Sequence, residues 1–175
     1  VVFRFLEDGI NENGSFTFLQ LQTMAQALAA SLQRAGNKGD SVLLLFQPSL
    51  EYVASLYACF YSGFIAVPAY PPRRNRGFDR IYRILKDSRT QICLVSKQVY
   101  DDIQRNFGDD EIFNNLQWII YEDIDASDHK YFQNVELNSE DLALIQYTSG
   151  STGQPKGVMI SQLNLLYNSE YIRQS

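Results

Sequence analysis

The sequence predicts an α/β protein with a mostly parallel sheet flanked by helices. Short apolar runs alternate with segments of helical periodicity along the chain, an order typical of helices layered on a parallel sheet. The run Val42–Phe46 is apolar without interruption, as expected of a strand buried on both faces. A loop rich in glycine and hydroxyl residues follows another apolar run at 142–145. No internal repeat or low-complexity region interrupts this order.

The beginning of the chain predicts a β-hairpin followed by a helix. Strand-like runs at 1–6 and 15–18 enclose a segment rich in turn residues, which is the pattern of a hairpin. A helix is expected from Leu21, with Gly36 at its end. Its inward face is expected to carry Met24, Ala25, Leu28 and Leu32.

Residues 52–72 carry no charge, and the segment is about long enough to cross a bilayer. Its glycine and its prolines argue against a membrane span, because they interrupt a helix. A helix that begins at the N-cap Ser49 and ends at Gly63, followed by a strand at 64–67, fits the pattern better. We therefore expect no stable membrane insertion.

The second half of the chain continues the alternation and ends in a helix. The polar segment 122–138 is expected to be irregular and exposed, without a chemical role. Ser161 is expected to cap the last helix, with Leu163, Leu166 and Tyr167 inward. The other expected elements are an amphipathic helix marked by Phe78, Ile81, Tyr82 and Leu85, strands at 91–95, 116–121, 142–147 and 157–160, and a helix at 96–106.

Composition bounds the possible functions. With 45% hydrophobic and 13% aromatic residues, the 175-residue chain can form a substantial core. A net charge of −5 argues against nucleic-acid binding, although 73–89 is basic and 101–128 acidic, as solvated surfaces often are. Cys59 and Cys93 lie in apolar surroundings and are expected to be buried thiols. Because His129 is the only histidine, the sequence offers almost no material for a His-containing zinc site or a Ser-His-Asp triad.

Residues 147–158 read YTSGSTGQPKGV and predict a phosphate-binding loop. Its glycines allow backbone N–H groups to converge on an anion, and its hydroxyls and lysine add donors. In a Walker A loop the lysine directly follows a glycine and opens a helix, whereas here Gln154 and Pro155 intervene and a strand follows. A flexible linker is the alternative. The candidate phosphate-binding residues are Thr148, Ser149, Gly150, Ser151, Thr152, Gly153, Lys156 and Gly157.

This motif resembles the phosphate loop of the adenylate-forming superfamily, which includes acyl-CoA synthetases, amino-acid adenylation domains and fatty acyl-AMP ligases. The segments 60–73, 145–149 and 158–166 are similar to those of fatty acyl-AMP ligases in particular. One departure is Gln162, where many relatives have histidine. Because an amide does not titrate near neutral pH, any role of a titrating group there is in doubt.

The resemblance implies a cytoplasmic enzyme that uses ATP and Mg²⁺ to convert a fatty acid to acyl-AMP and pyrophosphate. The acyl group would pass to an acyl carrier protein or to a polyketide or peptide synthase module. Lys156 is the implied catalytic residue, and no metal ligand is assigned. An acyl-CoA synthetase, an amino-acid adenylation domain and a non-catalytic nucleotide-binding or structural fragment remain alternatives.

The resemblance also implies that residues 1–175 are the N-terminal portion of a large adenylation domain. The rest of that domain and a mobile C-terminal lid domain are then absent, and the piece alone is expected to be inactive. The length of the fatty acid, the carrier protein and the oligomeric state do not follow from the sequence.

Overall fold

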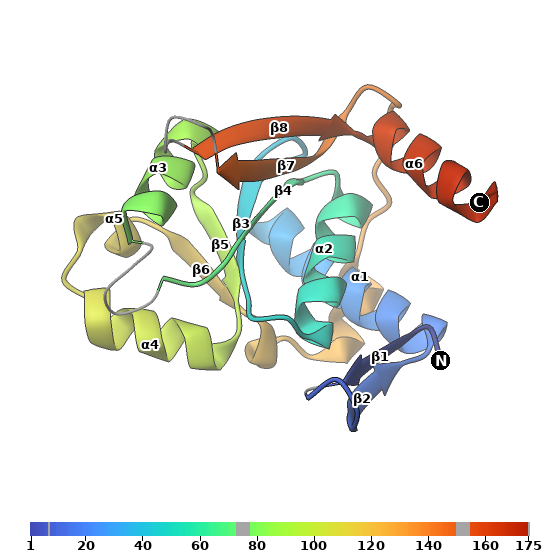
Figure 1. Ribbon diagram of the computed structural model, residues 1–175, viewed down its shortest axis with the longest axis horizontal. Coiled ribbons are helices and arrows are strands. Elements are labelled where there is room, and N and C mark those ends of the chain that lie inside the picture. Colours follow the sequence, from blue (N-terminus) through green and yellow to red (C-terminus); the bar gives the residue numbers. More distant parts are fainter. Residues whose placement is uncertain (7, 73–77, 150–154, 175) are drawn as a thin grey trace.

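A six-stranded sheet lies between two layers of helices in the computed structural model, which describes residues 1–6, 8–72, 78–149 and 155–174 (Figure 1). The strand order is β6-β5-β3-β4-β7-β8, and only the β7–β8 pair is antiparallel. The predicted α/β class with a mostly parallel sheet is therefore confirmed. The strands are β3 (Ser41–Leu45), β4 (Ile65–Ala69), β5 (Ile92–Val95), β6 (Gln117–Ile120), β7 (Leu142–Ser149) and β8 (Pro155–Ser161).

The two helical layers explain why β3 is apolar from Val42 to Leu45. Val42 and Leu44 belong to the core beneath one layer, and Leu43 and Leu45 belong to the core beneath the other. Successive side chains of a strand point to opposite faces, so a strand covered on both faces has no polar position. The first layer contains α1 (Phe18–Ala35) and α2 (Leu50–Ser62), and the second contains α3 (Phe78–Ser88), α4 (Lys97–Phe107) and α5 (Glu111–Asn114) (Figure 1).

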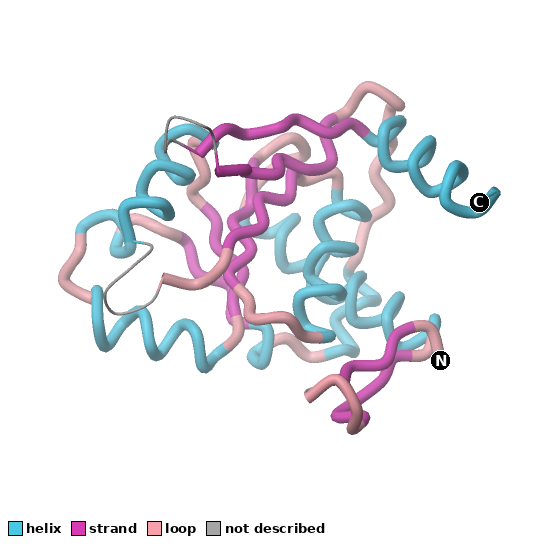
Figure 2. The backbone as a smooth tube through the Cα atoms, viewed as in Figure 1, coloured by secondary structure: helices cyan, strands magenta, loops and turns pink. Residues whose placement is uncertain are grey.

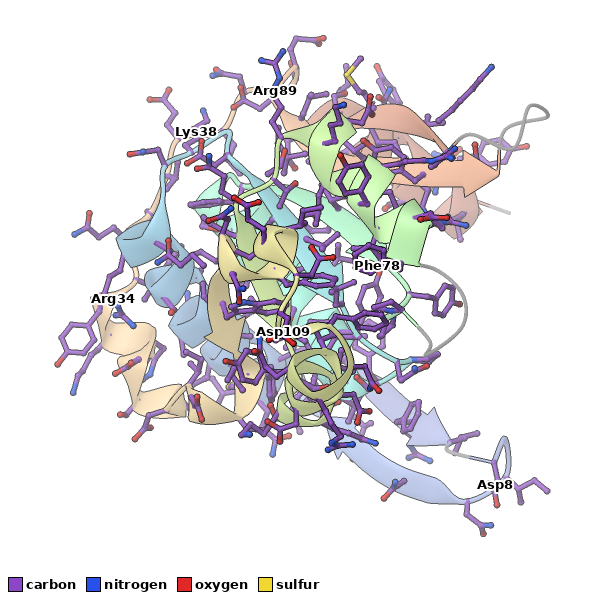
Figure 3. The ribbon with its side chains drawn as sticks, turned by 90° about the vertical axis from the view of Figure 1, so that its left-hand side faces the viewer. Asp8, Arg34, Lys38, Phe78, Arg89 and Asp109 are labelled. Carbon is purple, nitrogen blue, oxygen red and sulfur yellow. The ribbon has the colours of Figure 1, made fainter. Side chains whose placement is uncertain are left out.

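The predicted N-terminal hairpin is confirmed as β1 (Phe3–Leu6) and β2 (Glu12–Phe16), which lie apart from the main sheet (Figure 2). Its tip, with Asp8, projects away from the body of the molecule (Figure 3). The predicted boundaries were wrong, because the second strand ends at Phe16 and α1 already begins at Phe18. Thr17 and Gln20 form a capping box there, which satisfies N–H groups that a helix start leaves free.

The predicted ends of α2 are confirmed. The Ser49 hydroxyl accepts a hydrogen bond from the Tyr52 N–H at 3.3 Å. Gly63 ends the helix with a φ of 72°, a left-handed conformation that glycine adopts without steric cost. Within the described ranges, no helix combines the length and the apolar character that a membrane span requires.

The segment between β6 and β7 is more ordered than predicted. It contains the short 3-10 helices η1 (Tyr121–Asp123) and η2 (Ala126–Tyr131). Gln33 of α1 and Gln133 exchange side-chain-to-backbone hydrogen bonds of 2.7 and 3.1 Å. Lys38 Nζ donates to the Glu136 carbonyl and lies 2.7 Å from Asp141 Oδ2. The segment thus follows α1 and ties it to the start of β7.

Two predicted inward faces were wrong in part, although Ile81 and Leu85 of α3 are buried as predicted. In α6 (Gln162–Gln174), Leu166 and Tyr167 are 67% and 69% exposed, although Ser161 caps the helix as predicted by accepting from the Asn164 N–H. In α3, Tyr82 is exposed and Ile84 is buried in its place. Apolar spacing identified both helices, but packing decided which side chains are covered.

Both cysteines are buried, as predicted, and we expect them to be inert in the folded chain. Cys59 lies on α2 and Cys93 on β5, and burial raises the pKa of both thiols. Because the thiolate is the reactive form, a disulfide-exchange dye should label neither cysteine quickly under native conditions. Two thiols should react per chain after unfolding in guanidinium. Rapid labelling of the native chain, at a rate close to that of a free thiol, would contradict this prediction.

Candidate active site

The predicted phosphate loop lies in the sequence between β7 and β8, which pair as an antiparallel hairpin at one edge of the sheet (Figure 1). β7 continues to Ser149 and β8 begins at Pro155, so both strands extend further toward the loop than the apolar pattern predicted. Gly150, Ser151, Thr152 and Gly153 lie outside the described residues. The other candidates, Thr148, Ser149, Lys156 and Gly157, lie in the two strands that lead into and out of the loop.

Thr148 and Lys156 are brought together by the register of the hairpin. They are directly opposite each other on the antiparallel strands, and both are exposed. Directly paired residues place their side chains on the same face of a sheet. A hydroxyl and an ammonium group therefore lie side by side at the loop end of the hairpin, where both are suited to bind phosphate oxygens.

Gly157 lies opposite Tyr147, and its missing side chain makes room for the tyrosine ring. A Cβ atom at position 157 would lie 2.8 Å from Ile145 Cγ2 and 3.1 Å from Tyr147 Cζ. Contacts this short require the neighbours to move. The structure thus gives Gly157 a packing role, whereas its predicted contact with phosphate stays a prediction.

Gly157→Val is expected to destabilise the chain by about 1–3 kcal/mol through overpacking. Valine otherwise favours a strand more than glycine does. A loss of stability would therefore come from the close contact with Tyr147 and not from strand propensity. Urea unfolding measures it, with Met159→Val as the control, since Met159 is 67% exposed on the same strand. Equal stability of Gly157→Val and the parent chain would show that the hairpin has room for a side chain there.

A cleft of about 430 Å³ borders the base of the loop. It lies at the carboxyl ends of the parallel strands β3, β4 and β7, which is the edge where open α/β sheets bind ligands. Its wall is mostly aromatic and apolar, with a few polar groups, as small-molecule sites commonly are. The lining residues are Phe46, Gln47, Pro48, Tyr52, Pro68, Ala69, Tyr70, Arg80, Gln146 and Tyr147.

Two side chains of α3 hold Tyr147, the residue that precedes Thr148. The Tyr147 hydroxyl donates to Asp87 Oδ2 at 2.5 Å, and Arg80 Nη2 donates to the Tyr147 carbonyl oxygen at 3.2 Å. Burial, followed by the hydrogen bond to Asp87, raises the pKa of Tyr147, so the phenol remains a donor at neutral pH. Sequence reasoning missed both contacts, because it assigned Arg80 to a solvated basic stretch and did not single out Asp87.

The described residues contain no group of three or more histidine, cysteine, aspartate or glutamate side chains placed to hold a metal ion. Gln162, the departure from the usual histidine, begins α6 at the end of β8 opposite the loop. Its backbone N–H donates to the Asp141 carbonyl at 2.9 Å.

The fold and the hairpin define a class: a doubly wound α/β protein with a cleft at the carboxyl edge of its sheet, lined in part by the strand that leads into a glycine- and hydroxyl-rich sequence. The chain belongs to the AMP-binding enzyme family, which matches residues 2–174. The resemblance to adenylate-forming enzymes is thereby confirmed.

Individual relatives are similar over almost the whole chain. The crystal structure of a fatty acyl-adenylate ligase from L. pneumophila, in complex with acyl adenylate and pyrophosphate, superposes with a TM-score of 0.87 and 38% identity over 98% of the chain. The medium-chain-fatty-acid–[acyl-carrier-protein] ligase JamA of Moorena producens is 33% identical over 99% of it. The O-succinylbenzoate coenzyme A synthetase of Bacillus subtilis, in complex with AMP, gives a TM-score of 0.68 at 25% identity over 91% of the chain. The chain spans 29%, 30% and 40% of these proteins, respectively.

Proposed function

We propose that the chain is part of a fatty acyl-AMP ligase, which activates a fatty acid with ATP to acyl-AMP and pyrophosphate. The observation that carries this proposal is the 38% identity, over 98% of the chain, with a fatty acyl-adenylate ligase. The hairpin that flanks the loop supports it, because Thr148 and Lys156 pair next to Tyr147, which lines a cleft large enough for part of a nucleotide or acyl substrate.

In the proposed reaction, a carboxylate oxygen of the fatty acid attacks the α-phosphorus of ATP. The bond from this phosphorus to the oxygen that bridges to the β-phosphate breaks, and pyrophosphate leaves with that oxygen. Both reactants are anions, so the protein must mainly position them and neutralise charge. We propose that residues 148–153 and Gly157 bind the β- and γ-phosphates. Lys156 neutralises the charge of the departing pyrophosphate.

ATP is proposed to bind with Mg²⁺, which would neutralise phosphate charge when bound. The described residues provide no acidic cluster for the ion. We therefore assign none of them as a metal ligand and derive no step from it.

The acyl group is proposed to pass to an acyl carrier protein or to a polyketide or peptide synthase module. The name of JamA supports this acceptor. Transfer to coenzyme A is the second candidate, and the likeness to the O-succinylbenzoate coenzyme A synthetase favours it. We further propose that residues 1–175 form the N-terminal portion of a large adenylation domain, since the chain spans only 29–30% of the fatty-acid ligases that it resembles.

Pyrophosphate release tests the proposal, measured for a longer protein that includes this chain and for the 175 residues alone. The longer protein should release pyrophosphate when ATP is mixed with a fatty acid, whereas amino acids should give no signal. The short chain should be inactive. Mass spectrometry with coenzyme A or a pantetheinylated carrier protein then identifies the acceptor. Release that depends on an amino acid instead of a fatty acid would overturn the proposed substrate class.

A further inference from the structure

Tyr147 connects both strands of the β7–β8 hairpin to helix α3. Along β7 it directly precedes Thr148, so no residue lies between it and the first phosphate-binding candidate. Across the hairpin its ring occupies the space left by Gly157, the neighbour of Lys156. A displacement of the Tyr147 ring would therefore move the backbone on both sides of the loop.

We propose that Tyr147, held by Asp87 and Arg80 of α3, is a positioning residue that fixes Thr148 and Lys156, the phosphate-binding candidates on either side of the loop, relative to the cleft. The inference rests on the proposed function, since it assigns a role in placing ATP. Tyr147 acts through the residues on either side of the loop. It is not proposed to touch the reacting atoms.

The contact with Asp87 has the properties of a strong hydrogen bond. The Tyr147 side chain is almost fully covered, with 4% of the residue exposed, whereas its partners Asp87 and Arg80 lie on the exposed face of α3. The acceptor is a carboxylate at 2.5 Å, and hydrogen bonds to charged acceptors are shorter and about twice as strong as neutral ones. Arg80 holds the Tyr147 carbonyl at the same time, so side chain and backbone are both fixed.

Helix α3 is a suitable reference for this contact because the core holds it firmly. Ile81 and Ile84 are 1% and 0% exposed. Phe78, at the start of the helix, points toward the interior (Figure 3), where its ring stacks on Phe107 with centroids 5.2 Å apart. A side chain attached to this helix therefore has a defined position relative to the sheet.

A double-mutant cycle of Tyr147→Phe and Asp87→Ala in the longer protein tests the inference. Phenylalanine keeps the ring in its place opposite Gly157 and removes only the hydroxyl. Each single variant should raise the KM for ATP about tenfold, as expected for the loss of one charge-assisted hydrogen bond. The KM for the fatty acid should stay within about twofold. Because both changes remove the same contact, the double variant should be no worse than either single one.

The controls separate positioning from folding. Tyr82→Phe and Asp79→Ala change the same kinds of groups at exposed sites of α3 and should leave the KM for ATP unchanged. Asp87→Asn keeps an acceptor for the hydroxyl and should recover part of the loss. Additive effects of Tyr147→Phe and Asp87→Ala, or a lower melting temperature with an unchanged KM for ATP, would contradict the inference.

Amide hydrogen exchange tests the positioning role without any activity. In the same proteins, Tyr147→Phe should speed the exchange of the Thr148 and Lys156 amides about tenfold, and Tyr82→Phe should not. If the parent protein releases no pyrophosphate, the proposed function fails while this measurement still decides the role of Tyr147. If the parent is active and neither the exchange nor the KM for ATP responds, the proposed function stands and the positioning role is wrong.

Discussion

Lys156→Ala is expected to slow pyrophosphate release by about 10² to 10³, with little change in the stability of the fold. Removal of one preorganised group that faces developing charge typically costs this much. Lys156 is exposed near the start of β8, opposite Thr148, and changes at exposed positions usually alter stability by only about 0.5 kcal/mol. The rate of pyrophosphate release should therefore fall far more than the stability of the fold.

Single-turnover pyrophosphate release and urea unfolding of the longer protein measure the two effects separately. Lys130→Ala is the matched control, because Lys130 is an exposed lysine on η2, which packs on α1. Lys156→Arg keeps the charge and should be less impaired than Lys156→Ala. A Lys156→Ala protein with near-normal release would remove Lys156 from the mechanism and leave the loop amides and hydroxyls to bind the phosphates.

The hairpin shows how far the sequence could predict the site. The apolar residues of 142–147 and 157–160 predicted both strands, but β7 and β8 extend beyond them to Ser149 and Pro155. Strand pairing is made by the backbone, so it continues where hydrophobicity ends. The motif itself predicted the kind of ligand, because its residue types and spacing have few other uses.

The contacts of Tyr147 could not be predicted in the same way. Asp87 and Tyr147 are 60 positions apart, and they meet only because β7 joins the sheet beside β4, next to the connection that contains α3. Spacing along a sequence carries no signal for a contact that depends on strand order. The exposed apolar face of α6 has a similar explanation, since a helical pattern shows which residues share a face but not whether another element covers it.

Phe113→Ala is expected to lower the free energy of unfolding by about 3–5 kcal/mol, as for other buried phenylalanines. Phe113 is 1% exposed, and its ring lies 5.7 Å from that of Phe78 and 6.1 Å from that of Trp118. The Trp118 indole N–H donates to the Phe113 carbonyl at 3.1 Å. Loss of the ring therefore leaves a cavity in the core that α3, α5 and β6 share.

Urea unfolding measures the effect, and Phe18→Ala is the control, because Phe18 is 75% exposed at the start of α1. The control should change stability by no more than about 0.5 kcal/mol. Similar losses for the two variants would mean that the aromatic cluster is not part of the stabilising core.

Because Phe78 joins α3 to the same cluster, Phe113→Ala should also raise the KM for ATP at temperatures where the protein remains folded. The core on this face of the sheet would then support both the stability of the fold and the position of the phosphate loop.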